Sequence, residues 1–267
     1  MDAKTLDLTV DGTSIQLACL HRPGPRAPLV SLHGFGSTKE DYADVSMRPE
    51  FQDRCLFFWD APGFGASDID DPSALSIPFL VKVALAAFDA VGVDRFHLTG
   101  HSMGGLTGLL LANEHQERVL SFMNIEGNIA PEDCFLSRQI VEHPATKAAD
   151  FVKGFIDRVR HRAEYGSAIY AAALPAKVRD TTFEPIFTSM VALSDGAPLM
   201  EMFTGLTCPR AFVYGAQNRH LSYLADLPEK GVEVLEIPHS GHFPMYSNPP
   251  ALWATLADFL ERHDPIL

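Results

Sequence analysis

A serine lies between glycines at the point where an apolar strand pattern changes to a helix pattern. The segment Gly100-His101-Ser102-Met103-Gly104-Gly105 follows a short apolar run over 95–99 and precedes a Leu-rich run over 106–115. The turn has no room for side chains at the flanking glycines, and it lifts the serine hydroxyl out of the sheet. The N–H of Met103 then lies at a helix N-terminus, which favours an anion. We therefore predict that Ser102 is a nucleophile; a buried serine in a glycine-rich turn is the simpler alternative.

Strand and helix patterns alternate along most of the chain. The segments 6–10 and 14–20 flank Asp11-Gly12 and predict a hairpin. Apolar runs predict buried strands, and 3.6-residue periodicity predicts helices. The predicted strands are 29–32, 55–59, 95–99, 119–125, 210–214 and 232–237, and the predicted helices are 77–91, 106–115 and 250–263. Because parallel crossovers bury a strand on both faces, this alternation predicts an α/β fold with a mostly parallel sheet.

The alternation stops between 128 and 207, where prolines interrupt helical patterns and large apolar side chains are frequent. We predict a core formed by 1–127 and 208–267, with 128–207 as a helical cap inserted at the carboxyl edge of the sheet, where ligands bind in such folds. The apolar cap side chains favour an apolar or aromatic acyl substrate, although packing within the cap is the alternative for any one of them. The candidates for substrate contact from this region are Phe135, Phe155 and Phe187.

A serine hydroxyl needs a base within hydrogen-bond reach. His242 lies in Ser240-Gly241-His242-Phe243-Pro244, just past the last predicted strand and at the same sheet edge as Ser102. We predict that His242 is the base and that Phe243 contacts the substrate. The other histidines considered are expected to be structural or on the surface: His33, His101, His220, His239 and His263.

A second oxyanion donor is expected in the loop after an early strand. His33-Gly34-Phe35-Gly36 fits, because its glycines let the backbone approach a reacting carbonyl closely. We predict that the N–H groups of Phe35 and Met103 hold the oxyanion. His33 and Gly34 are predicted to contact the substrate from the same loop.

Four motifs together resemble the α/β-hydrolase superfamily: 33–36, the turn Asp60-Ala61-Pro62-Gly63-Phe64-Gly65-Ala66-Ser67, 100–105 and 240–244. The resemblance covers the chain apart from the insertion. It implies an α/β-hydrolase fold with an eight-stranded, mostly parallel sheet flanked by helices under a helical cap. The superfamily includes esterases, thioesterases, lactonases, C–C hydrolases and hormone receptors, so no substrate follows from it. Epoxide hydrolases and haloalkane dehalogenases attack with an aspartate, and Ser102 excludes these two branches.

The triad acid departs from the commoner pattern of the superfamily. Most members carry it after the strand that here is 210–214, but the loop 215–220 has no carboxylate, and Asn218 lies about where the aspartate would fall. Some dehalogenases and lactonases place the acid one strand earlier, which here is Glu126. Burying a carboxylate at a strand end is costly without a partner. The resemblance therefore implies Glu126 as the acid. Asp226 and Asp195 are weaker candidates for the acid, and the simpler alternative for Glu126 is that it is an ordinary glutamate of a surface loop.

Composition excludes several other classes of protein. The formal net charge of −13 argues against nucleic acid or an anionic membrane as partner. The four cysteines are widely spaced, which indicates neither a zinc site nor a disulfide framework. The first residues lack the apolar core of a signal peptide, and no apolar run is long enough to span a bilayer. We expect a cytoplasmic monomer or homodimer that acts on a small molecule without a metal or cofactor.

Together these features predict a serine hydrolase that cleaves a carboxylic ester, thioester or lactone of an apolar or aromatic small molecule through an acyl-enzyme. Two alternatives stay open. A C–C hydrolase of diketone-type substrates would use the same triad. A receptor-like protein would keep the pocket with little turnover, and the missing aspartate at position 218 leaves room for that reading.

Overall fold

The computed structural model describes residues 1–142 and 148–265. Within these residues, nine strands form one sheet in the order β1-β2-β4-β3-β6-β7-β8-β9, and β5 pairs with β2 outside this path. The strands are β1 (Asp2–Val10), β2 (Thr13–Arg22), β3 (Arg26–Leu32), β4 (Arg54–Trp59), β5 (Asp68–Ile69), β6 (Phe96–His101), β7 (Val119–Ile125), β8 (Arg210–Gly215) and β9 (Glu233–Ile237). This arrangement confirms the predicted α/β-hydrolase fold.

The sheet is antiparallel at one edge and parallel elsewhere. β1 and β2 form the predicted hairpin around Asp11-Gly12, and β2 pairs antiparallel with β4. All remaining neighbours along the path, from β4 to β9, are parallel. The expected eight strands are those of the path; the additional β5 is a two-residue pairing against β2 that is too short to give a sequence pattern.

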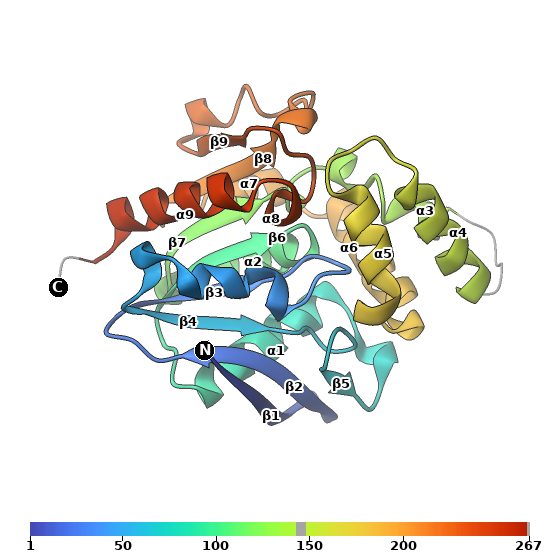
Figure 1. Cartoon of the computed structure of the whole chain (residues 1–267), viewed down its shortest axis with the longest axis horizontal. Helices are drawn as coiled ribbons and strands as arrows, with labels where there is room; N and C mark the ends of the chain where they lie inside the picture. The colour runs from blue at the N-terminus through green and yellow to red at the C-terminus, as the bar shows by residue number, and fades with distance from the viewer. Residues whose placement is uncertain (143–147, 266–267) are drawn as a thin grey trace.

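Helices cover both faces of the sheet (Figure 1). The helices α1 (Ile77–Ala90) and α2 (Met103–Glu114) lie on one face, while α9 (Pro249–His263) and the 3₁₀ segment η1 (Lys39–Met47) lie on the other. The short helix α8 (Pro244–Ser247) joins the loop of His242 to α9. Buried aromatic rings fill the space between sheet and helices, and the Phe88 ring packs edge-to-face on Phe57 and Phe96.

The insertion over 128–207 is helical. It contains α3 (Arg138–Val141), α4 (Ala148–Arg160), α5 (Ser167–Lys177), α6 (Phe183–Gly196) and α7 (Leu199–Thr204). The helices α3 to α6 lie beyond one end of the sheet (Figure 1). By contrast, α7 packs against α2, and its Phe203 ring contacts Phe122 and Phe212 of the strands. The last part of the insertion therefore lies on the sheet; the division into core and cap stays a prediction.

The C-terminal end of α5 is fastened to the core. Lys177 Nζ forms an ion pair with Asp41 of η1 at 2.6 Å, and its carbonyl accepts a hydrogen bond from the Gly65 N–H at 2.8 Å. The Arg179 N–H donates to the carbonyl of Gly63 at 3.1 Å. These bonds join the insertion to the turn over 60–67, and they fix its position relative to the loops at the sheet edge.

A largely buried polar cluster lies at the amino ends of β4 and β6. The Asp264 carboxylate accepts hydrogen bonds from Arg54 at 2.6 and 2.9 Å and from His97 Nε2 at 2.9 Å. His97 Nδ1 accepts from the Ser121 hydroxyl at 2.8 Å, so the imidazole is fully bonded in its neutral form. Burial, together with the Arg54 charge, lowers the pKa of His97 to about 4. The folded chain therefore resists protonation of this histidine.

We expect this histidine to make stability depend on pH. Its folded pKa lies below the unfolded value, so stability falls as pH decreases from about 6.5 toward the folded pKa, by up to about 1.4 kcal/mol per pH unit. The free energy of unfolding in urea should drop by about 2 kcal/mol between pH 7 and 5 through this group alone. The drop should be smaller in His97→Gln and unchanged in the exposed control His161→Gln. Equal pH dependence in the wild type and His97→Gln would contradict the assignment.

Candidate active site

Ser102 occupies a strained turn between β6 and α2. Its φ is +50°, in the left-handed region that non-glycine residues rarely adopt. The turn is closely packed: a Cβ at Gly100 would lie 2.3 Å from the carbonyl oxygen of Gly104, and one at Gly104 would lie 2.1 Å from that of Leu32. The helix begins at Met103, earlier than the apolar run over 106–115 predicted, because it starts directly from the turn.

The loop after β3 lies over this turn. A Cβ at Gly34 would lie 2.3 Å from Nδ1 of His101, so only glycine fits there. Among the described residues, the backbone N–H groups of Phe35 and Met103 have no hydrogen-bond acceptor. Two free donors on adjacent segments beside a serine hydroxyl are suited to bind a developing oxyanion.

His33 holds the loop and does not line either pocket. Its Nε2 accepts a hydrogen bond from the Ala61 N–H at 2.9 Å, so Nδ1 carries the proton and donates to the Gly34 carbonyl at 2.8 Å. Burial lowers the pKa of His33, which keeps the ring neutral. Both His33 and Gly34 are buried and line neither of the pockets described below, so their contact with a substrate stays a prediction.

His242 and Glu126 are hydrogen-bonded to each other. His242 Nδ1 lies 2.7 Å from Glu126 Oε2, which leaves the other imidazole nitrogen free to accept a proton. The carboxylate also accepts from the Gly215 N–H and from Asn218 Nδ2, each at 2.7 Å. With three donors around it and 4% of its side chain exposed, the group suits an ionised carboxylate.

Asn218 therefore lies beside Glu126 and donates to its carboxylate. Glu126 has a φ of +46° at the end of β7, and this strained backbone aims its side chain at the loop after β8. The other two carboxylates considered are elsewhere: Asp195 forms an ion pair with Arg138, and Asp226 is exposed.

His101 supports the loop that carries His242. Its Nε2 donates to the His242 carbonyl at 2.7 Å, and burial lowers its pKa well below the usual value. The ring is fully buried beneath the serine turn. This neutral histidine is therefore a structural support between the serine turn and the His242 loop.

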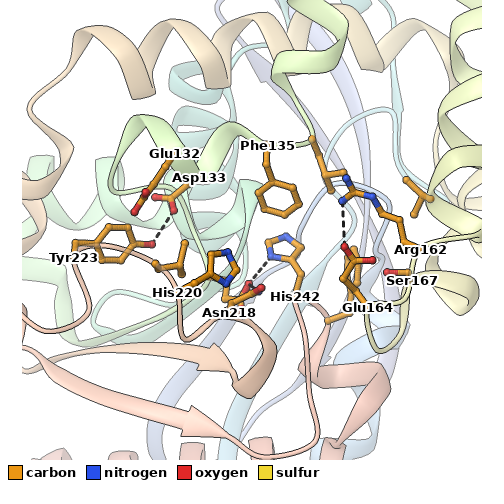
Figure 2. A pocket seen from close by; sticks show the side chains of 15 residues that line it. Glu132, Asp133, Phe135, Arg162, Glu164, Ser167, Asn218, His220, Tyr223 and His242 are labelled. Atoms are coloured by element: carbon orange, nitrogen blue, oxygen red, sulfur yellow. Dashed lines mark hydrogen bonds and ion pairs between the residues drawn. The ribbon is translucent and has the colours of Figure 1, made fainter.

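Two pockets meet at His242. The inner pocket, about 20 Å³, is lined by Ser102, Phe35, Tyr170, Phe187 and Met190. The outer pocket, about 400 Å³, is lined by apolar residues such as Val159 and by polar ones that include Glu132, Arg162 and His220, and Ser102 is not part of its lining. Both are lined by His242, Asp133, Phe135, Leu136 and Phe243. Figure 2 shows the Phe135 ring directly over His242.

The structure brings together some of the predicted substrate contacts but not all. Phe135, Phe187 and Phe243 line one or both pockets. Phe155 lies outside both pockets and is fully buried, with its ring packed against Phe183 and Phe187. Phe155 therefore belongs to the packing behind the pocket wall, and its contact with a substrate stays a prediction.

Sequence reasoning missed Asp133. This half-buried carboxylate lines both pockets and accepts a hydrogen bond from the Tyr223 hydroxyl at 2.8 Å, as Figure 2 shows. Burial raises the pKa of Asp133 to about 6. Its other oxygen accepts from the N–H groups of Ile129 and Ala130, which caps a short 3₁₀ turn. Pro131-Glu132-Asp133 could have indicated that turn, but nothing local indicated the pocket.

Within residues 1–142 and 148–265, the helices are too short or too polar for any of them to cross a membrane. The expected location, oligomeric state and absence of cofactors stay predictions.

The fold and the site are those of the α/β hydrolases: a serine turn follows β6, a histidine follows β9 and a glycine-rich loop follows β3. The chain belongs to the alpha/beta hydrolase family, whose model matches residues 29–256. The solved enol-lactonase of Burkholderia xenovorans LB400 has the same fold, with a TM-score of 0.76, 20% sequence identity, and coverage of 96% of this chain and 100% of that one.

Curated relatives match either locally or at low identity. A pimeloyl-[acyl-carrier protein] methyl ester esterase of Aeromonas hydrophila is 31% identical over 120 residues, which cover 45% of this chain and 43% of that protein. The chain thus spans less than half the length of such relatives. A 2-succinyl-6-hydroxy-2,4-cyclohexadiene-1-carboxylate synthase of Pectobacterium atrosepticum is 24% identical over 262 residues, covering 88% of this chain and 94% of that protein.

Proposed function

We propose that this chain is a serine hydrolase that cleaves a carboxylic ester, thioester or lactone of an apolar or aromatic small molecule through an acyl-enzyme. Ser102 is the nucleophile, His242 the base and Glu126 the acid, and the N–H groups of Phe35 and Met103 hold the oxyanion. The observation that carries the proposal is the 2.7 Å hydrogen bond between His242 Nδ1 and Glu126, at a pocket that Ser102 also lines.

The mechanism follows from this arrangement. Ser102 Oγ forms a bond to the substrate carbonyl carbon while its proton passes to His242 Nε2, and the carbonyl oxygen becomes an oxyanion. The carbonyl reforms as the bond to the leaving oxygen or sulfur breaks, and His242 returns the proton to the leaving atom. Water then attacks the acyl-enzyme with His242 again as base, which releases the carboxylic acid and restores Ser102. The Glu126 carboxylate stabilises the imidazolium in both halves of the cycle.

Relatives and neighbours named as an esterase and an enol-lactonase support this reaction class. The apolar walls around Ser102, formed by Phe35, Phe187 and Met190, support an apolar acyl group. The chain has no aspartate at position 218, and the three hydrogen bonds that Glu126 accepts support this glutamate as the acid instead.

A rapid-mixing experiment with p-nitrophenyl acetate tests this function. We expect a burst of p-nitrophenol equal to the enzyme concentration, followed by slower steady turnover, because formation and hydrolysis of an acyl-enzyme are separate steps. A receptor-like protein would give neither phase. A C–C hydrolase is distinguished in parallel by offering a vinylogous diketone, which we expect this chain to leave intact. The absence of p-nitrophenol release would reject the proposal.

A further inference from the structure

The two pockets at His242 differ about twentyfold in volume, at about 20 and 400 Å³. A site needs about 10–15 Å³ on this measure to hold one water-sized group. The inner pocket beside Ser102 therefore has room for one or two carbon-sized groups, whereas the outer pocket accommodates a molecule of many atoms.

The chemistry assigns each pocket to one half of the substrate. The acyl carbon becomes bonded to Ser102, and only the inner pocket is lined by that residue. The leaving oxygen must receive its proton from His242, which lines both pockets. The acyl group therefore lies in the inner pocket, and the alcohol leaves through the outer one.

Phe135 stands at the junction between the pockets. Its ring packs edge-to-face on the His242 ring, with centroids 5.3 Å apart, and it lines both cavities. The residue is 43% exposed, so no close packing around it requires an aromatic side chain. Figure 2 shows it between the Asp133–Tyr223 side and the Arg162–Glu164 side of the outer pocket.

Resting on the proposed function, we propose that the substrate is an ester or thioester of a short acyl group, about two carbons long, with a large alcohol or thiol portion. Phe135 is the specificity-determining residue that closes the inner pocket. The wall of the outer pocket is largely apolar, with side chains such as Val159 and Leu221. Its polar members, which include Glu132, Arg162 and His220, offer hydrogen-bond partners to the leaving portion.

Two substrate series test this assignment with the wild-type enzyme. In the acyl series, kcat/KM for p-nitrophenyl butyrate should be about tenfold below that for the acetate, and for the octanoate at least about 100-fold below, because each extra group overpacks the inner pocket. In the alcohol series, the larger 4-methylumbelliferyl acetate should be hydrolysed within about fivefold of p-nitrophenyl acetate. Hydrolysis of octanoate as fast as acetate would overturn the proposal.

Variants identify the side chains that limit the length of the acyl group. Met190→Ala enlarges only the inner pocket and should raise the butyrate-to-acetate ratio of kcat/KM about tenfold. Phe135→Ala joins the pockets and should raise the octanoate-to-acetate ratio about 100-fold, and Phe135→Leu should give an intermediate ratio. The matched control Val191→Ala, next to Met190 on α6 but outside both pockets, should leave the ratios unchanged.

These outcomes separate the inference from the function on which it rests. Acetate hydrolysis with no dependence on acyl length, or with ratios unaffected by Phe135→Ala, would reject the short-acyl assignment and keep the serine hydrolase. Failure to hydrolyse any ester, together with no reaction of Ser102 with a fluorophosphonate, would reject the serine hydrolase itself.

Discussion

Replacing Ser102 with alanine is expected to lower kcat for an activated ester by about 10⁴–10⁶-fold, because no other group at this position can form the acyl-enzyme. The residual rate would come from the oxyanion donors and from substrate binding. Stability should change little, because alanine keeps the Cβ that the φ of +50° already accommodates and the residue is only half-buried. Steady-state kinetics and urea unfolding of the two proteins measure both effects.

A fluorophosphonate probe identifies the nucleophile independently of any substrate. We expect it to label Ser102 in the wild type and in the control Ser73→Ala, whose exposed serine lies in a distant turn, and not to label Ser102→Ala. Peptide mapping by mass spectrometry locates the adduct. Labelling of another serine, or full activity in Ser102→Ala, would reject Ser102 as the nucleophile.

The sequence predicts best what local patterns determine. The turn at Ser102 needs glycines because backbone atoms lie 2.1–2.3 Å from where their Cβ atoms would be, and this packing leaves a recognisable motif. The strands ending at 32, 101 and 237 are short apolar runs, so their carboxyl ends, and the loops that follow them, could be placed at one sheet edge.

The contacts of Glu126 depend on pairing between distant strands. Ile125 of β7 is in register with Val213 of β8, which brings Glu126 beside the Gly215 N–H. No local pattern encodes that register. The sequence could therefore indicate Glu126 as a candidate acid without showing that Asn218 donates a hydrogen bond to it. The pockets depend in addition on how the insertion packs over the sheet, which is why the sequence did not indicate Asp133 as a pocket residue.

Changing Glu126 to glutamine is expected to lower kcat by up to about 10⁴-fold, by analogy with the aspartate-to-asparagine change in the serine protease triad. The glutamine keeps the shape but removes the charge that stabilises the imidazolium. It also places an amide among three donors, from Gly215, Asn218 and His242, where its own NH₂ has no acceptor. Single-turnover and steady-state hydrolysis of p-nitrophenyl acetate measure the loss.

Variants at Asn218 distinguish a supporting donor from a triad member. Asn218→Ala removes one of three hydrogen bonds to Glu126 and should cost about tenfold or less. Asn218→Asp places a second carboxylate next to Glu126, and the repulsion between them should lower activity further. In the double variant Glu126→Gln/Asn218→Asp that repulsion is gone and a carboxylate is restored beside the site, so activity should rise above that of Glu126→Gln alone. In a protein with a broken triad none of these changes would matter, and near wild-type turnover by Glu126→Gln would end the assignment of Glu126 as the acid.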